Sequence, residues 1–452
     1  MSAKTIGADL TEGSVGARLF RFSVPFMLAN LLQTVYNMVD MVVVGHFVGA
    51  DGLSAVSTCG ELIQLYTFIA IGFGGAGQTM IGQFVGAKDR ERVSRTIGTV
   101  FTVLMLMALG ITLFCFATVN WQLGLINLPA EAAESGRAYL LVCAAGMVFI
   151  FGYNLISSIL RGMGDSKYPL LFIAVASVVN LILDLLFVPV LKLGAMGAAL
   201  ATVLGQGVAF GWALVFLYRR RTDFGFDFKP ARFIPHADVL GTLLRLGIPM
   251  AAQGALISVS MLYVCSMLND FGVAASAANG IQLKLANITR IVTTAMCTAA
   301  SAMIAQCVGA GKQERVKSVF WWDLIISMVA ALAFGVVLLL LPRQIFGLFN
   351  TEEAVLAYAS VYAVFGLFDC IGNAMRSPCN ALVNGTGAAL LGLTASVIDG
   401  VLCRIGFSIL FGNVLGMGVA GYWLGSTLAG YVSVVILAPF FLTGAWKRKK
   451  RL

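Results

Sequence analysis

Apolar runs recur along the whole chain, and turn residues and charges separate them. Many runs approach or exceed the ~20 residues that a helix needs to cross a bilayer. Read against the breaks, they give six expected helices in the first half, over residues 18–45, 53–82, 95–120, 135–160, 168–190 and 195–218. The second half gives six more, over residues 240–268, 275–307, 317–341, 355–383, 388–411 and 417–443. The pattern predicts an all-α polytopic membrane protein with twelve transmembrane helices.

The two halves of this pattern share sequence. The segment "MIGQFVGAKDRERV" (80–93) aligns with "MIAQCVGAGKQERV" (303–316) at an offset of 223, and nine of the fourteen positions are identical. Further on, "LRGMGD" (160–165) parallels "VNGTGA" (383–388) at the same offset. Because each half has an even number of helices, the copies share one orientation and are related by an axis along the membrane normal. We expect two pseudo-symmetric six-helix lobes with a binding cavity between them.

The polar stretch between the halves sets the expected domain boundaries. It reads "RRRTDFGFDFKPARFIPHAD" and is basic and Pro-containing. We expect an N-lobe over 1–218, a cytoplasmic linker over 219–239, a C-lobe over 240–443 and a basic cytoplasmic tail over 444–452. The first residues lack the apolar run and small-residue cleavage site of a signal peptide, so we expect none to be removed.

Composition and charge agree with a membrane protein and orient it. Of the 452 residues 59% are hydrophobic and 11% charged, too few charges to cover a soluble protein of this size. The net charge of +9 comes from basic clusters in alternate loops, the positive-inside pattern, which favours a membrane surface over nucleic acid as the partner. We expect a multi-pass protein of the inner (plasma) membrane with both termini cytoplasmic. Six Lys and Arg residues are then not on the cytoplasmic side. Three lie on the outer side of the membrane (Arg137, Lys192 and Arg343) and three lie within spans (Lys284, Arg290 and Arg404).

Two carboxylates in the first half are the strongest candidates for chemistry, because ionisable groups inside spans are costly and mark functional sites. Asp40 lies in the first expected helix and Asp184 in the fifth. Asn180 precedes Asp184 by four residues and shares its helical face, and Thr202 adds a hydroxyl from the sixth helix. Such oxygen ligands suit Na⁺ or a shared proton. The alternative is that these groups make only interhelical hydrogen bonds.

The same helix as Asp40 carries a polar stripe in "NLLQTVYNMVDMVVVG", at the spacing i, i+3, i+4 and i+7. This spacing places the side chains on one face, where they can form the wall of a cavity. Pro25 removes a backbone hydrogen bond upstream, which predicts either a hinge or a static kink. The candidate cavity-lining residues are Gln33, Tyr36, Asn37, Met147, Asn154, Gln253 and Asp369.

The second half carries a different set of charges. At the repeat offset, Asp40 and Asp184 have no acidic counterparts. Charges of both signs occur there instead: Lys284, Arg290, Asp369, Asp399 and Arg404. Mixed signs favour a neutralised ion-pair network, structural or gating, over a cation site. Asp369 is the member that we expect to function.

Several segments together resemble the multidrug and toxic compound extrusion (MATE) family. They are "SVPFMLANLLQTVYNMVDMVVVGHFVGADGLSAVS", "GQFVGAKDRERV" with its second copy, and "LRGMGDSKYP", and the similarity covers essentially all twelve expected helices. The resemblance implies cation-coupled export of amphipathic, often cationic compounds by alternating access of the lobes. It implies no cofactor, Na⁺ or H⁺ as the coupling ion, and an N-lobe ion site at Asp40, Asn180, Asp184 and Thr202. Members with a C-lobe ion site carry a Glu on the seventh helix, which "GIPMAAQGALIS" lacks.

Three other functions compete with that of a transporter. A flippase for lipids or lipid-linked oligosaccharides needs a strongly basic central cavity, whereas the basic residues within spans are offset by acids. An intramembrane enzyme needs a metal or nucleophile motif, and the sequence has no H-E-x-x-H, paired G-x-G-D or Ser/His arrangement, so we expect no catalytic residues. A passive channel differs from a transporter in that its flux does not depend on an ion gradient. We expect a monomer whose partners are small-molecule substrates and membrane lipids.

Overall fold

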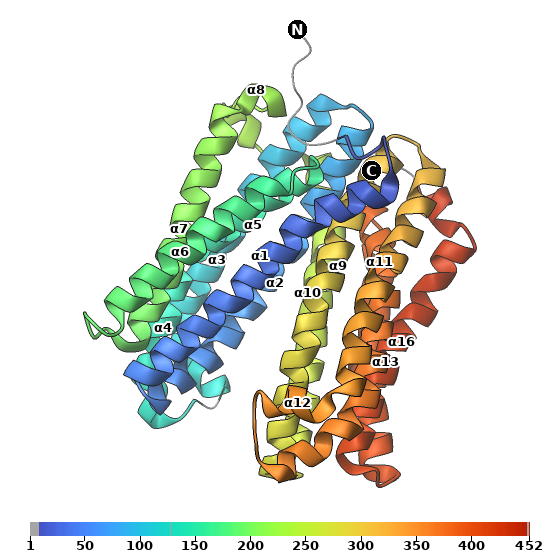
Figure 1. Cartoon of the computed structure of the whole chain (residues 1–452). Coiled ribbons are helices and arrows are strands. Elements are labelled where there is room, and N and C mark those ends of the chain that lie inside the picture. Colours follow the sequence, from blue (N-terminus) through green and yellow to red (C-terminus); the bar gives the residue numbers. More distant parts are fainter. Residues whose placement is uncertain (1–8, 127, 450–451) are drawn as a thin grey trace. The chain divides into compact units, whose positions relative to one another are not determined.

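A computed structural model describes residues 9–126, 128–449 and 452 of the chain, and all regular structure within them is helical (Figure 1). The helices of the first half are α1 (Val15–Phe47), α2 (Ala50–Gly86), α3 (Arg90–Leu125), α4 (Ala133–Ala145), α5 (Met147–Gly162), α6 (Lys167–Phe187), α7 (Gly194–Arg219) and the short α8 (Arg221–Phe224). Helices satisfy their own backbone hydrogen bonds, which is why an apolar chain in a membrane adopts them.

The second half follows the same order. Its helices are α9 (Ala237–Asn269), α10 (Val273–Gly309), α11 (Gln313–Leu340), α12 (Pro342–Gly347), α13 (Glu353–Gly385), α14 (Ala389–Ser396), α15 (Ile405–Ile409) and α16 (Gly418–Leu442). Two π-helical segments, η3 (Val397–Arg404) and η4 (Leu410–Val414), flank α15. Short 3₁₀ turns occur at η1 (Ala130–Ala132), η2 (Pro230–Phe233) and η5 (Ala445–Arg448).

The prediction of an all-helical polytopic protein is confirmed. Within the described residues, eleven helical segments are long and apolar enough to cross a membrane, and the bent pair α4–α5 brings the total to twelve. Two of the expected straight spans differ in detail. The fourth is broken at Gly146, where α4 and α5 meet at an angle of 47°. The eleventh runs from Ala389 to Val414 and contains both π-helical segments.

Contacts divide the chain into two compact units. The first, called here the N-terminal unit, comprises Pro25–Ala251. The second, called the C-terminal unit, comprises Leu10–Val24 together with Ala252–Leu452. The division falls inside α1 just before Pro25, and inside α9 two residues after Pro249. The predicted N-lobe (1–218), linker (219–239) and C-lobe (from 240) are defined by the order of the helices, whereas these units are defined by contacts. The predicted boundaries therefore stay a proposal.

The repeated glycine motif has one structural role in both units. In the N-terminal unit, a Cβ atom added to Gly162 at the end of α5 would lie 2.8 Å from the carbonyl oxygen of Gln78. In the C-terminal unit, a Cβ added to Gly385 at the end of α13 would lie 2.7 Å from the carbonyl oxygen of Ser301. Both pairs of positions are related by the repeat offset. The glycines are needed because two helix backbones approach too closely for a side chain.

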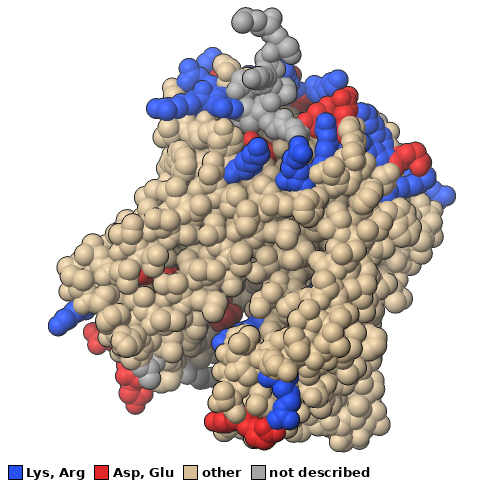
Figure 2. Space-filling model, viewed as in Figure 1, with Lys and Arg blue, Asp and Glu red and all other residues tan. Residues whose placement is uncertain are grey.

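The outer surface of each unit suits a bilayer. Large apolar side chains are exposed along the flanks, as on α3, where Leu106 is 61% and Leu113 is 70% exposed. Lys and Arg side chains gather at the helix ends, where α3 and α11 begin and where α7 ends, and the flanks between are nearly free of charge (Figure 2). Exposed apolar surface of this extent is unusual for a soluble protein and is typical of a lipid-facing one.

Candidate functional site

Side chains from three helices of the N-terminal unit meet at the four residues predicted to bind the coupling ion. Asp40 comes from α1, Asn180 and Asp184 from α6, and Thr202 from α7. The Nδ2 of Asn180 donates a long hydrogen bond of 3.4 Å to the Thr202 hydroxyl, which lies 3.5 Å from Oδ2 of Asp40. Asp184 lies one helical turn from Asn180 on α6, and its carboxyl group interacts electrostatically with that of Asp40. The structure therefore brings the four predicted residues into one cluster.

The close packing of α6 on α7 positions this cluster (Figure 1). Asn180 and Asp184 lie one turn apart on the buried face of α6 and are 3% and 0% exposed. Gly205 of α7 lies against this face, and a Cβ added there would be 2.9 Å from the carbonyl oxygen of Ala176 and 3.2 Å from Cβ of Asn180. A side chain at position 205 would hold the helices apart, so the glycine allows Thr202 to reach Asn180.

Four buried oxygens of the cluster have no hydrogen-bond donor among the residues that the structure describes. They are Oδ1 of Asp40, Oδ1 of Asn180 and both carboxylate oxygens of Asp184. Buried acceptors are normally paired, and two neighbouring carboxylates cannot both remain charged in an apolar interior without compensation. A proton shared by the acids, or a cation bound by the four oxygens, satisfies the cluster. Its chemistry therefore fits Na⁺ or H⁺.

The rest of the polar stripe lies beside the cluster on α1. Gln33 and Asn37 are exposed, whereas Tyr36 and Asp40 are half-buried. Gln206 of α7, one turn after Thr202, is buried and leaves its Oε1 without a donor. Sequence reasoning missed Gln206, although its i+4 spacing from Thr202 is the same signal that found Asn180. Contact of Gln33, Tyr36 and Asn37 with substrate stays a prediction.

The other predicted cavity residues have diverse surroundings. Met147 is fully buried at the start of α5, and Asn154 is half-buried and donates from Nδ2 to the carbonyl of Ile150 in its own helix. In the C-terminal unit, Gln253 is half-buried and its Nε2 lies 3.3 Å from the carbonyl oxygen of Ala389. Pro25 lies inside α1, which remains helical on both sides of it. Met147 thus offers no open surface in this structure, and substrate contact by these residues stays a prediction.

The charges of the C-terminal unit are only partly neutralised, in contrast to the predicted network. Asp399, which is fully buried, pairs with Arg404 at 3.0 Å and Arg376 at 3.3 Å, and accepts a hydrogen bond from Ser433. Sequence reasoning missed Arg376. Lys284 does not belong to the network, because its Nζ lies over the ring of Phe349 instead.

Arg290 and Asp369 also depart from the prediction. No carboxylate of the described residues lies within ion-pair distance of Arg290, so Arg290 and Asp369 do not form a salt bridge. Asp369 accepts a hydrogen bond of 3.0 Å from Asn373 Nδ2, and Asn373 Oδ1 in turn accepts one from Arg376. Asp369 is therefore linked to the Asp399 network through an amide and lines a pocket that is described below.

A further buried carboxylate, Asp323 of α11, was missed by sequence reasoning. It is 0% exposed, and its Oδ1 lies 3.0 Å from the hydroxyls of both Ser327 and Ser377. The only sequence signal is a single acid in the apolar run "FWWDLIISM". In the described part of the chain, no group of three or more His, Cys, Asp and Glu side chains is arranged to hold a metal ion.

A family model decides the classification. The MatE model matches the chain twice, over residues 25–186 and 249–410, so that each match covers one copy of the repeat. The chain belongs to the MatE family. MatE proteins are transporters, and this membership agrees with the resemblance found in the sequence and with the two-lobe fold that it implied.

Two bacterial relatives of this MatE protein extend along its full length. The probable multidrug resistance protein YpnP of Bacillus subtilis is 28% identical, over 98% of each chain. The probable multidrug resistance protein YoeA of the same organism is 29% identical, over 97% of this chain and 96% of its own. Among solved structures, a MOP superfamily transporter from Pyrococcus furiosus shares the fold with a TM-score of 0.91 at 22% identity, over 99% of this chain and 100% of its own.

Proposed function

We propose that this chain is a secondary active antiporter that exports amphipathic, often cationic drugs or toxic metabolites in exchange for inward Na⁺ or H⁺. The observation that carries the proposal is the set of four buried oxygens without donors on Asp40, Asn180 and Asp184. A purely structural polar cluster is expected to be satisfied internally, whereas an ion site leaves acceptors for its ion. The two relatives, both probable multidrug resistance proteins, support compounds of this class as cargo.

The coupling follows from the cost of leaving the acids uncompensated. When the ion leaves toward the cytoplasm, Asp40 and Asp184 regain charge and repel each other, and α1 and α6 are driven to a different arrangement. When an ion binds from outside, the repulsion ends. The ion shifts the lobes only by its differential affinity for the two arrangements, and the substrate does the same at its own site.

The proposed moving parts are the two lobes, 1–218 and 240–443, joined by the linker 219–239. Pro25 is the proposed hinge, since it removes one backbone hydrogen bond from α1 fifteen residues before Asp40. We place both termini and the basic tail on the cytoplasmic side of the plasma membrane, and we propose that the protein acts as a monomer.

Efflux from proteoliposomes tests the proposal. The full chain is reconstituted into proteoliposomes with a fluorescent organic cation such as ethidium at equal concentration on both sides. A Na⁺ gradient or a pH gradient is then imposed in separate runs. We expect one of the gradients to drive net export of the dye. We also expect Asp40→Asn and Asp184→Asn to reduce export to the passive leak.

The matched control is Glu134→Gln, which removes an exposed carboxylate at the start of α4, away from the cluster. It is expected to leave coupled export unchanged. Coupled export that survives in both aspartate variants would remove the ion site from this cluster. Flux that is independent of either gradient would identify a channel instead.

A further inference from the structure

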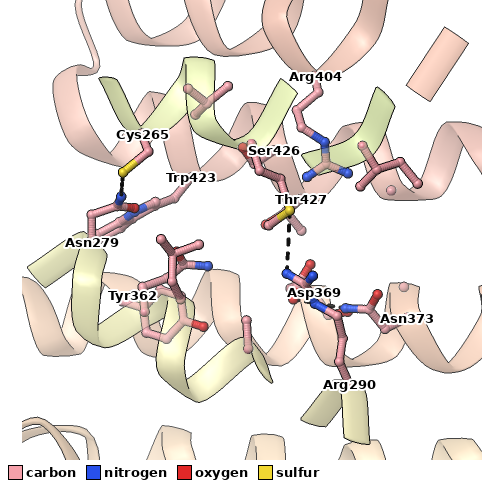
Figure 3. Close-up of a pocket in the computed structure, with 18 of the residues that line it drawn as sticks. Cys265, Asn279, Arg290, Tyr362, Asp369, Asn373, Arg404, Trp423, Ser426 and Thr427 are labelled. Atoms are coloured by element: carbon pink, nitrogen blue, oxygen red, sulfur yellow. Dashed lines mark hydrogen bonds between the residues drawn. The ribbon is translucent and has the colours of Figure 1, made fainter. Parts of the chain in front are cut away.

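A pocket lies within the C-terminal unit, walled by α9, α10, α13, α16 and the π-helical segment η3 (Figure 3). We propose that this pocket binds the anionic group of an amphipathic compound, with Arg290 as its main charge partner. As a substrate subsite the assignment rests on the export function proposed above, but binding itself can be measured without transport.

The pocket holds more positive than negative charge. Three guanidinium groups line it, those of Arg290, Arg376 and Arg404. The negative groups are Asp369, which lines the pocket, and Asp399, which is buried behind it and pairs with two of the arginines. One positive charge is left over. An arginine cannot lose its proton in a protein, so this charge cannot be removed as a lysine's can.

Of the three guanidinium groups, that of Arg290 is the one without an ion pair among the described residues, and Asp369 attracts it only from beyond ion-pair distance. Its one short contact within the described residues is a weak one, from NH2 to the sulfur of Met261 at 3.7 Å. A guanidinium has five N–H donors, and a thioether satisfies one of them poorly. An arginine without an ion pair inside a membrane span is costly and is expected to serve a ligand. Carboxylate and phosphate groups match its planar donors best.

Arg404 supplies a second donor to the same pocket. It is 7% exposed, and its terminal nitrogen is engaged by Asp399 at 3.0 Å. Its Nε has no hydrogen-bond partner in the described part of the chain. Figure 3 shows Arg404 and Arg290 reaching toward the pocket from different helices. Arg404 belongs to a π-helical segment, a local geometry that often marks functional sites because it redirects side chains.

The remaining walls are apolar and aromatic. The rings of Tyr362 and Trp423 pack edge to face at 5.4 Å, and Met261 and Leu268 continue the surface from α9. Thr427, which carries a hydroxyl, also lines the pocket. A ligand therefore needs an anionic end for Arg290 and an apolar, preferably aromatic, body. An inorganic anion alone would leave the apolar walls unused.

Ligand binding to the purified full chain in detergent tests the proposal. The probes are three dansyl compounds with the same ring: dansylglycine carries a carboxylate, dansylamide is neutral and dansylcadaverine is cationic. We expect dansylglycine to bind at least tenfold more tightly than dansylamide. Equal binding of the two would overturn the proposal.

Variants locate the preference at Arg290. Arg290→Gln is expected to weaken dansylglycine binding at least tenfold while leaving dansylamide unchanged, and Arg290→Lys is expected to restore most of the binding. Loss of folding is not expected, because no carboxylate of the described residues forms an ion pair with Arg290. The matched control, Lys284→Gln, removes a cation from the same helix outside the pocket and is expected to change nothing. A preference for the anion that survives in Arg290→Gln would contradict the assignment.

Competition identifies the source of the anion. Short-chain phosphatidylglycerol, compared with phosphatidylcholine of the same length, tests a lipid headgroup, and 2-naphthoate compared with 2-naphthol tests a soluble compound. Displacement by either anion above its neutral or zwitterionic counterpart supports the site and names the source. Displacement by neither would overturn it. If the pocket prefers anions but no gradient drives export, the anion site stands and the proposed antiport fails. If a gradient drives export but the pocket shows no preference for anions, the antiport stands and the anion site fails.

Discussion

The hydroxyl of Thr202 lies 3.5 Å from Oδ2 of Asp40, although 162 residues separate them in the sequence. The same hydroxyl accepts a hydrogen bond from Asn180, so one side chain of α7 connects α1 with α6. Thr202 is thus the connection between the two parts of the cluster, and the proposed ion site depends on its oxygen.

Replacing this hydroxyl by a methyl group is expected to weaken the proposed ion site. Thr202→Val keeps the shape of the side chain but leaves Asp40 and Asn180 without their shared partner. Because the two hydrogen bonds are long, we expect a loss of about tenfold in ion affinity, or about 1.4 kcal/mol. The measurement is the ion concentration that gives half-maximal export in proteoliposomes. Thr202→Ser, which keeps the oxygen, is the control, and equal behaviour of both variants would exclude a role for the hydroxyl.

Adding a methyl group at Gly205 is expected to disturb the same site through the backbone. The new Cβ of Gly205→Ala would lie 2.9 Å from the carbonyl oxygen of Ala176, so α6 and α7 must separate. Overpacking of this kind costs about 1–3 kcal/mol. We expect a lower melting temperature in detergent together with weaker ion coupling. Gly211→Ala on the same helix meets nothing within 4 Å and should be neutral or slightly stabilising.

Hydropathy was sufficient to predict the helices, but their irregularities follow from packing. The apolar run through "LLVCAAGMVFIFGY" is continuous, so nothing in its pattern indicates the 47° break at Gly146. Likewise, nothing in the sequence distinguishes the π-helical segment Val397–Arg404 from the rest of its span, because a change of hydrogen-bond register does not alter average hydropathy. Sequence reasoning therefore located the spans and not their bends.

The candidate sites differ in how far spacing revealed them. Asn180 and Asp184 share a face by their i, i+4 spacing, and the family resemblance linked them to Asp40 and Thr202. Arg290 was expected to be neutralised by nearby acids, but pairing depends on distances that a sequence does not contain. The same holds for Asp323, whose partner Ser377 lies 54 residues away. Local spacing predicts contacts within a helix, and contacts between helices need the fold.

The buried Asp323 gives a prediction about stability. Ser377 lies 3.0 Å and 3.2 Å from its two carboxylate oxygens, so Ser377→Ala leaves a buried polar group with fewer partners. Such a loss costs about 1–3 kcal/mol, and we expect a measurable drop in the melting temperature of the detergent-solubilised protein. Ser318→Ala is the control, because that hydroxyl bonds only to the carbonyl of Glu314 one turn earlier on the same helix. The hypothesis fails if both variants melt at the same temperature.

The last prediction concerns the glycines of the repeat. A Cβ at Gly162 or Gly385 would meet a backbone carbonyl at 2.8 Å or 2.7 Å, and a carbonyl held in a helix cannot rotate away. We expect Gly162→Ala and Gly385→Ala each to lower the free energy of unfolding by about 1–3 kcal/mol.

The effects of the two substitutions should also add, because the sites lie in different units and share no partners. Thermal melting of both single variants and of the double variant measures this. Gly110→Ala and Gly280→Ala, one in each unit and with nothing within 4 Å of the added atom, are the matched controls. Because the repeat preserves a close backbone approach in both units, tolerance of alanine at one site and not the other would show that the copies no longer pack alike.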